Sequence, residues 1–177
     1  MRIETATIRR LRDALLQSGR RASAVMSPAY ETLARAGLLS ADETTALSRI
    51  DPIAETLFLM IAADGKITDS ERDAMRGAIR GLTGDLLHDG TIQVMLEQYE
   101  RTLSAEGRDA RLRKVSGVLV NQPSDAECAF ALAAAIALAD DEVAEEETQL
   151  VDQLAGWFGI SKERSSAILE QLEDDKA

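Results

Sequence analysis

The stretch LFLMIAADGKITDSERDAM, residues 57–75, joins an apolar segment to a polar one through a short turn. Shifting the chain by 76 residues lays this stretch on AAAIALADDEVAEEETQLV, residues 133–151. In both copies an apolar helix is expected to end at an Asp, and a second helix to begin just before a Glu. The sequence therefore predicts two helical hairpins that carry the same acids. The matched pairs are Ala63 with Ala139, Asp64 with Asp140, Ile67 with Val143, and Glu71 with Glu147.

Composition and helix signals extend this expectation to the whole chain. Its 177 residues include only 3 Pro and 3% aromatic residues, and clusters of the residues typical of strands are missing. We expect an all-α protein, a bundle of about eight helices with two pseudo-symmetric hairpins, preceded by a basic N-terminal helix. Helix starts are indicated by Pro28, Pro52 and the capping boxes at 40–43, 68–71 and 124–127, and helix ends by Gly37, Gly65, Gly81 with Gly84, Gly107 and Gly159.

The N-terminal part differs in charge from the rest. Residues 1–36 hold seven Arg and three acids, a net charge of +4. Because the whole chain has a net charge of −11, residues 37–177 carry −15. We divide the chain at this point into a basic helical extension, 1–36, and a helical domain, 37–177. Within the extension, Ile8, Leu11 and Leu15 form a narrow apolar stripe on a helix expected over 4–17. The stripe is expected to pack on the main body; an anionic membrane surface or a partner helix are the alternatives.

Charge and composition limit the classes of partner. A net charge of −11 argues against DNA or RNA, whose phosphates are bound by Lys and Arg, and favours a cation or a basic protein surface. The single cysteine, Cys128, and the single histidine, His88, supply neither a disulfide nor a structural zinc site. The longest apolar run has eleven residues, 129–139, too few to cross a bilayer. We therefore expect a cytoplasmic protein without a transmembrane segment.

The repeated acids are the candidate functional residues. Capping explains Glu71, which lies three residues after Thr68, but Glu147 recurs where Ala144 offers no capping oxygen. Asp64 and Asp140 lie at helix ends, where a carboxylate opposes the dipole by about 0.3–1 kcal/mol, so a positive group nearby is expected to compensate. The spacing is not that of an EF-hand, but four pooled carboxylates suit a hard divalent cation of the Ca²⁺ or Mg²⁺ class.

These motifs resemble a known family. The pairs LFLMIAADGKITDSE and ALADDEVAEEE, with the later AGWFGISKERSSAILEQL, are similar to the paired motifs of TerB-like domains, the tellurite-resistance TerB family, over about residues 52–172. The resemblance implies an all-helical bundle with an acidic patch proposed as a metal site, protein partners, a role in metal-ion or stress response, and no enzymatic activity. Its acidic positions fall on Asp64, Glu71, Asp140 and Glu147. The chain departs from the family pattern at Lys66, Asp141 and Ala144.

Two functional interpretations stay open. In the first, the chain is a non-catalytic interaction domain of a tellurite, metal-ion or general stress response whose acidic patch binds a divalent cation. In the second, it is a structural adaptor whose acidic face binds a basic partner, with Asp64 and Asp140 held by Arg or Lys. Hydrolysis by paired carboxylates ranks third, because no aromatic platform for a sugar accompanies the acids. His88 is expected at the surface, and Cys128 in the core rather than as a nucleophile.

Overall fold

The computed structural model describes residues 3–18, 28–62, 67–137 and 145–175, and in these ranges every regular element is an α-helix. The all-α prediction is confirmed, with nine helices in the described ranges against the eight or so expected. The helices are α1 (Thr5–Gln17), α2 (Pro28–Arg35), α3 (Ala41–Ile61), α4 (Asp69–Thr83), α5 (Asp89–Glu106), α6 (Arg108–Leu119), α7 (Pro123–Ala137), α8 (Glu145–Trp157) and α9 (Lys162–Asp174).

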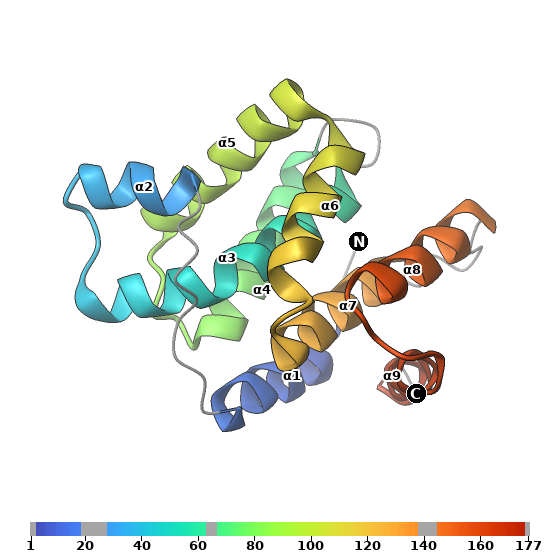
Figure 1. The fold of residues 1–177 in the computed structure, drawn as a ribbon. Coiled ribbons are helices and arrows are strands. Elements are labelled where there is room, and N and C mark those ends of the chain that lie inside the picture. Colours follow the sequence, from blue (N-terminus) through green and yellow to red (C-terminus); the bar gives the residue numbers. More distant parts are fainter. Residues whose placement is uncertain (1–2, 19–27, 63–66, 138–144, 176–177) are drawn as a thin grey trace.

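Helices α3 and α7 form the centre of the bundle (Figure 1). They pack against each other, α3 is also covered by α4, α5 and α6, and α7 by α1, α8 and α9. The Ala-rich sequence of α7 allows this crowding, because small side chains let neighbouring helices approach closely. Phe58 of α3 and Phe130 of α7 are both fully buried, and Cys128 is in the core as predicted. Among the described residues, no helix combines the length and the apolar character needed to cross a membrane.

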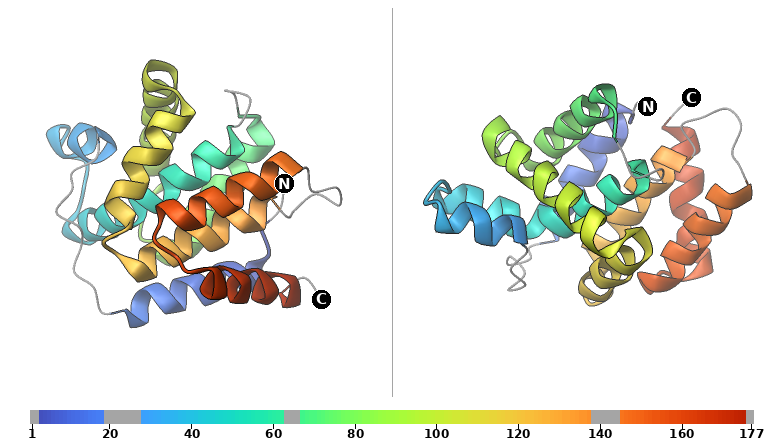
Figure 2. Two further views of the ribbon diagram at one scale, coloured as in Figure 1. Left: turned by 45° about the vertical axis from the view of Figure 1, so that its right-hand side comes forward. Right: turned by 90° about the horizontal axis from the view of Figure 1, so that it is seen from above.

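The basic N-terminal helix packs on the main body, as the favoured interpretation of its stripe predicted. Ile8, Leu11 and Leu15 are buried, and α1 contacts α4 and α7. In Figure 2, α1 and α9 lie side by side although they are at opposite ends of the sequence. Thr7 Oγ1 and Arg10 Nη2 donate hydrogen bonds to Asp175 Oδ2 at 2.9 and 2.8 Å. These hydrogen bonds therefore join the first helix, α1, to the residue that follows the last helix, α9.

The hairpin helices keep the 76-residue spacing of the sequence repeat. Helix α3 ends at Ile61 and α7 at Ala137, while α4 begins at Asp69 and α8 at Glu145. Within each copy the two helices contact one another. The hairpins were therefore placed correctly along the chain, and their pseudo-symmetry in space remains a prediction.

Most helix signals are confirmed. The capping boxes expected at Ser40 and Thr68 are present. In each, the side-chain oxygen of the cap residue accepts from the backbone N–H of the Glu three residues later, and the Glu carboxylate accepts from the backbone N–H of the cap residue. Gly84 ends α4 in the left-handed conformation at φ 61°, where a residue without Cβ is favoured. Gly81, predicted to share this role, lies inside α4 instead.

Two predicted helix starts are wrong. Pro52 does not begin a helix; it lies inside α3, which runs unbroken through it. An interior proline costs about 3 kcal/mol, and burial of Leu47, Ile50 and Ile53 on both sides of it outweighs that loss. The last capping box is also wrong, because α7 begins with Pro123 at its first position and the carbonyl of Gln122 accepts its first hydrogen bonds.

Candidate functional site

The predicted site lies where α3 turns into α4 and where α7 turns into α8. Of its four acids, Asp64 and Asp140 lie outside the described residues. Glu147 is in the first turn of α8, and its side chain also lies outside the description. Glu71 is the one predicted ligand whose side chain is described, so the proposed convergence of the four carboxylates stays a prediction.

Glu71 combines a capping role with an unused oxygen. Its Oε2 accepts from Thr68 N at 2.7 Å and from Thr68 Oγ1 at 2.8 Å, while Oε1 accepts no hydrogen bond from the described residues. No described Arg or Lys forms an ion pair with it, and the neighbouring Arg72 pairs with Glu100 of α5. Capping thus fixes the carboxylate at the start of α4 and leaves one oxygen and the negative charge for another positive group.

The donor chemistry of the four acids fits a hard cation. Carboxylate oxygens are the ligands that Ca²⁺ and Mg²⁺ prefer, and the Glu71 Oε1 described above could serve as one. Within the described part of the chain, no three His, Cys, Asp or Glu side chains gather closely enough to hold a metal. That search does not reach Asp64 or Asp140, so the predicted set is neither supported nor contradicted by it.

A second acidic centre lies at the start of α3. Glu43 completes the Ser40 capping box, and its Oε1 also accepts from Thr91 Oγ1 at 3.1 Å and lies 2.7 Å from His88 Nδ1. The hydrogen bond with His88 is the largest of the effects that lower the pKa of Glu43 to about 2. The ring of His88 is 79% exposed, as expected for a surface residue, yet no local sequence pattern indicates this contact. The cluster joins α3 to the start of α5.

A third group of charges is buried between α3, α5 and α6. Glu55 Oε1 accepts from Arg111 Nε and Nη2 at 2.8 and 2.6 Å, and Tyr99 OH donates to Asp51 Oδ1 at 2.6 Å. Burial raises the pKa of Glu55 to about 7 against the opposing charge of Arg111, and it also raises the pKa of Tyr99. Because these side chains are closed off from solvent, they hold the three helices together rather than offer a reactive group to a substrate.

Sequence reasoning missed both of these clusters. For the buried cluster, the available signal was the position of Asp51 and Glu55. They lie four residues apart on one face of the largely apolar segment IDPIAETLFLMI, residues 50–61. Charges inside such a segment are seldom buried without partners. Their partners come from residues about 50 positions away, as in the Tyr99 to Asp51 bond across 48 residues, and no local pattern identifies them. The Cys128 thiol is buried too, and burial raises its pKa, which suits a core residue.

Comparison with known proteins identifies a family. The family model of the tellurite resistance protein TerB matches residues 51–171, a span that contains the turns of both hairpins and most of α9. No curated protein and no solved structure matches the chain.

Proposed function

The chain belongs to the TerB family, and from this premise we propose that it is a non-catalytic interaction module of a tellurite, metal-ion or general stress response. Its working element in this proposal is an acidic patch at the hairpin turns that binds a divalent cation of the Ca²⁺ or Mg²⁺ class. The ligands would be Asp64, Glu71, Asp140 and Glu147, with backbone carbonyls and water completing the coordination. A bound cation would then present a defined surface to a protein partner.

The observation that carries this proposal is the state of Glu71. Its carboxylate is oriented by two hydrogen bonds from Thr68, and among the described residues its Oε1 accepts no hydrogen bond and no Arg or Lys pairs with it. The recurrence of the Asp and Glu at a spacing of 76 residues, on helix ends that keep the same spacing, supports a shared role for the four acids. A capping function alone does not require this recurrence, since Ala144 cannot cap.

The alternative is a structural adaptor whose acidic face binds a basic protein without metal. The charge on Glu71, which no described Arg or Lys pairs with, favours it equally, because an Arg or Lys from a partner would complete the patch as a cation does. The two interpretations differ in what stabilises the isolated protein. A metal ion that binds only the folded state must raise the apparent stability of the chain by itself.

The test is thermal unfolding of the full chain after EDTA treatment, followed by addition of Ca²⁺, Mg²⁺, Mn²⁺ or Zn²⁺ one at a time. At an ion concentration of 100 times Kd, binding contributes about 2.7 kcal/mol, an easily measured rise in Tm. If no ion changes Tm, the metal proposal is overturned and the adaptor interpretation remains.

A variant pair assigns any ion effect to the proposed ligands. Asp140→Asn with Glu147→Gln should abolish the rise in Tm on ion addition. Glu170→Gln with Asp174→Asn removes the same charge from exposed positions on α9 and should leave the rise intact. Equal loss in both double variants would mean that ions act through general screening, which would contradict a specific site.

A further inference from the structure

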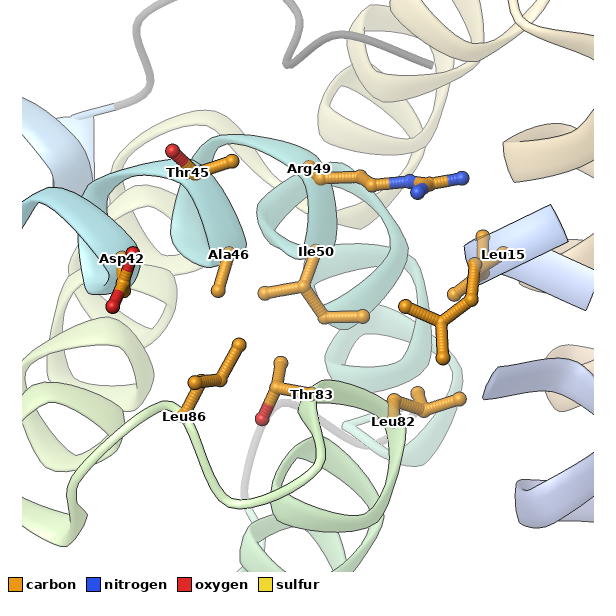
Figure 3. Close-up of a pocket in the computed structure, with 10 residues that line it drawn as sticks. Leu15, Asp42, Thr45, Ala46, Arg49, Ile50, Leu82, Thr83 and Leu86 are labelled. Carbon is orange, nitrogen blue, oxygen red and sulfur yellow. The ribbon is translucent and has the colours of Figure 1, made fainter. Parts of the chain in front are cut away.

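A groove lies between α1, α3 and α4 (Figure 3). Its volume is about 410 Å³, within the range of ligand-binding clefts. The side chains of Leu86, Ala46, Ile50, Leu82 and Leu15 converge on this space in Figure 3. The full lining is Leu15, Leu16, Asp42, Thr45, Ala46, Arg49, Ile50, Leu82, Thr83 and Leu86.

The wall of the groove is apolar in spite of its two threonines. Thr83 Oγ1 donates to the carbonyl of Ile79 at 2.8 Å, and Thr45 Oγ1 donates to that of Ala41 at 3.1 Å. Each hydroxyl hydrogen is thus used within its own helix, so neither threonine offers a free donor to a ligand in the groove. Over this part of the wall a partner is therefore expected to present apolar groups.

The rim of the groove exposes apolar surface that nothing in the described chain covers. Four large apolar side chains are exposed in the described residues, and two of them, Leu16 at 69% and Leu86 at 48%, line this groove. The other two, Leu38 and Val120, do not line it. Exposed leucines beside an apolar groove mark a binding surface more strongly than exposed leucines scattered singly.

The charges at the groove indicate the sign of the partner. The charge of Arg49 is matched within this chain, since its Nη2 donates to Ser18 Oγ and lies 3.4 Å from Asp125 Oδ1, although its buried Nε has no hydrogen-bond partner among the described residues. Asp42, exposed in the first turn of α3, forms no ion pair with the described residues. The carboxylate of Asp42 is therefore the charge at the rim that a partner would have to match, and a basic group matches it.

We propose that this groove binds a basic amphipathic helix of another protein, with aliphatic side chains in the groove and a Lys or Arg at Asp42. The described chain is all helix and has no sheet edge for an added strand, so a helix laid between helices is the available mode. The basic helix of the chain itself, α1, cannot be the occupant in a second copy, because its Ile8, Leu11 and Leu15 are already buried. The proposal names a second surface and does not depend on the cation.

The probes are two fluorescein-labelled helical peptides with the same leucine face, one flanked by Lys and the other by Glu. Fluorescence anisotropy with the full chain should show the Lys peptide binding about tenfold more tightly or better. Leu86→Glu and Asp42→Lys should each weaken the Lys peptide about tenfold. The matched controls are Leu38→Glu, at an exposed Leu outside the groove, and Asp69→Lys, at an exposed Asp in the first turn of α4. Each control should change the affinity of the chain for the Lys peptide less than twofold.

Several outcomes would overturn the proposal. They are equal affinities of the two peptides, no binding of either, or equal weakening by the groove variants and their controls. Sedimentation must also show a monomer; a dimer that Leu86→Glu splits would assign the groove to a second copy instead. Leu16→Glu, at the more exposed leucine, replaces Leu86→Glu if circular dichroism shows that the latter does not fold. EDTA should leave peptide binding unchanged, which separates this result from the cation test.

Discussion

At the residue scale, Glu43 and Glu71 occupy the same position of two capping boxes, and their surroundings give them different roles. Glu43 is buried and its carboxylate also meets His88 and Thr91 across the α3 to α5 contact. Glu71 bonds only to Thr68 among the described residues and keeps one oxygen unused. The same local sequence pattern therefore gives Glu43 a structural role as a clamp that links α3 to α5, and leaves Glu71 as a candidate metal ligand.

This contrast predicts different costs for the same substitution. Glu43→Gln should lower the free energy of unfolding by about 1.5–3 kcal/mol at neutral pH, because it weakens hydrogen bonds to a buried charge. The pKa of Glu43 is lowered, so its contribution is present above the unfolded value and is lost as pH falls from about 4 towards 2. Urea unfolding of wild type and variant at several pH values measures both effects. Glu71→Gln is the control with the same capping role, and an equal loss in the two variants would contradict the clamp.

Glu55 predicts a pH dependence of the opposite sign. Its pKa is raised to about 7 by burial, so the folded chain holds this proton more tightly than the unfolded chain does. Wild-type stability should therefore fall relative to Glu55→Gln as pH rises from about 5 to 7, by up to about 1.4 kcal/mol per pH unit. Chemical denaturation across this range provides the measurement.

The control for Glu55 is its neighbour in the same network. Lys114 lowers the pKa of Glu106, so Glu106 itself does not titrate between pH 5 and 8, and Glu106→Gln should leave most of the Glu55 pH dependence in place. Parallel stability curves for wild type and Glu55→Gln would show that Glu55 does not titrate in this window.

At the element scale, α1 is fixed by a close approach to α4 at Gly81. A Cβ at this position would lie 2.6 Å from Ile8 Cγ2, too close for the stiff, branched isoleucine side chain to stay in place. The glycine at this interior position of α4 therefore leaves space for α1, and Gly84, not Gly81, ends the helix.

Two glycines of α4 make a matched test of this contact. Gly77→Ala should stabilise the protein by about 0.5–1 kcal/mol, because Ala is the better helix former and a Cβ at Gly77 meets nothing within 4 Å. Gly81→Ala gains the same propensity but must displace Ile8, and we expect a net loss of about 1–3 kcal/mol. Thermal unfolding measures the change in Tm of both variants, which should rise for Gly77→Ala and fall for Gly81→Ala. Equal stabilisation would mean that α1 does not pack at Gly81.

At the scale of the whole molecule, the described chain has one continuous core in which α1 takes part. Ile8, Leu11 and Leu15 belong to it, and Arg10 and Thr7 tie α1 to Asp175. The family match begins at residue 51, inside α3, so the helices before it extend a structure that the match only partly covers.

The predicted division at residue 36 is tested by removing the extension. The fragment 37–177 should unfold at a lower temperature than the full chain, because each of the three buried side chains of α1 contributes about 1.5–3 kcal/mol. Calorimetry measures the change, and binding of a dye to exposed apolar surface provides an independent check. An unchanged Tm would support two independent units divided at residue 36.

Local patterns were sufficient for much of the fold. Capping boxes at Ser40 and Thr68, Pro28, and the glycines at 37, 84, 107 and 159 located helix boundaries correctly, because each satisfies or ends a backbone hydrogen-bond pattern within a few residues. The same local logic failed at Pro52. There, burial of the flanking side chains Leu47, Ile50 and Ile53 in the core, which the local sequence does not encode, keeps the helix intact.

The helical class, the spacing of the hairpins and the identity of the repeated acids could all be obtained from the sequence, because they follow from periodicity, capping and recurrence along the chain. The family came from the resemblance of the paired motifs to TerB-like domains. The contacts of Glu43 with His88 and of Glu55 with Arg111, and the position of Leu16 and Leu86 at one groove, emerged only from the folded structure. These contacts join residues far apart in sequence, and their partners are set by how whole helices pack. This difference arises because hydrogen-bond caps act over one turn of helix, whereas burial and ion pairing act between any surfaces that the fold brings together.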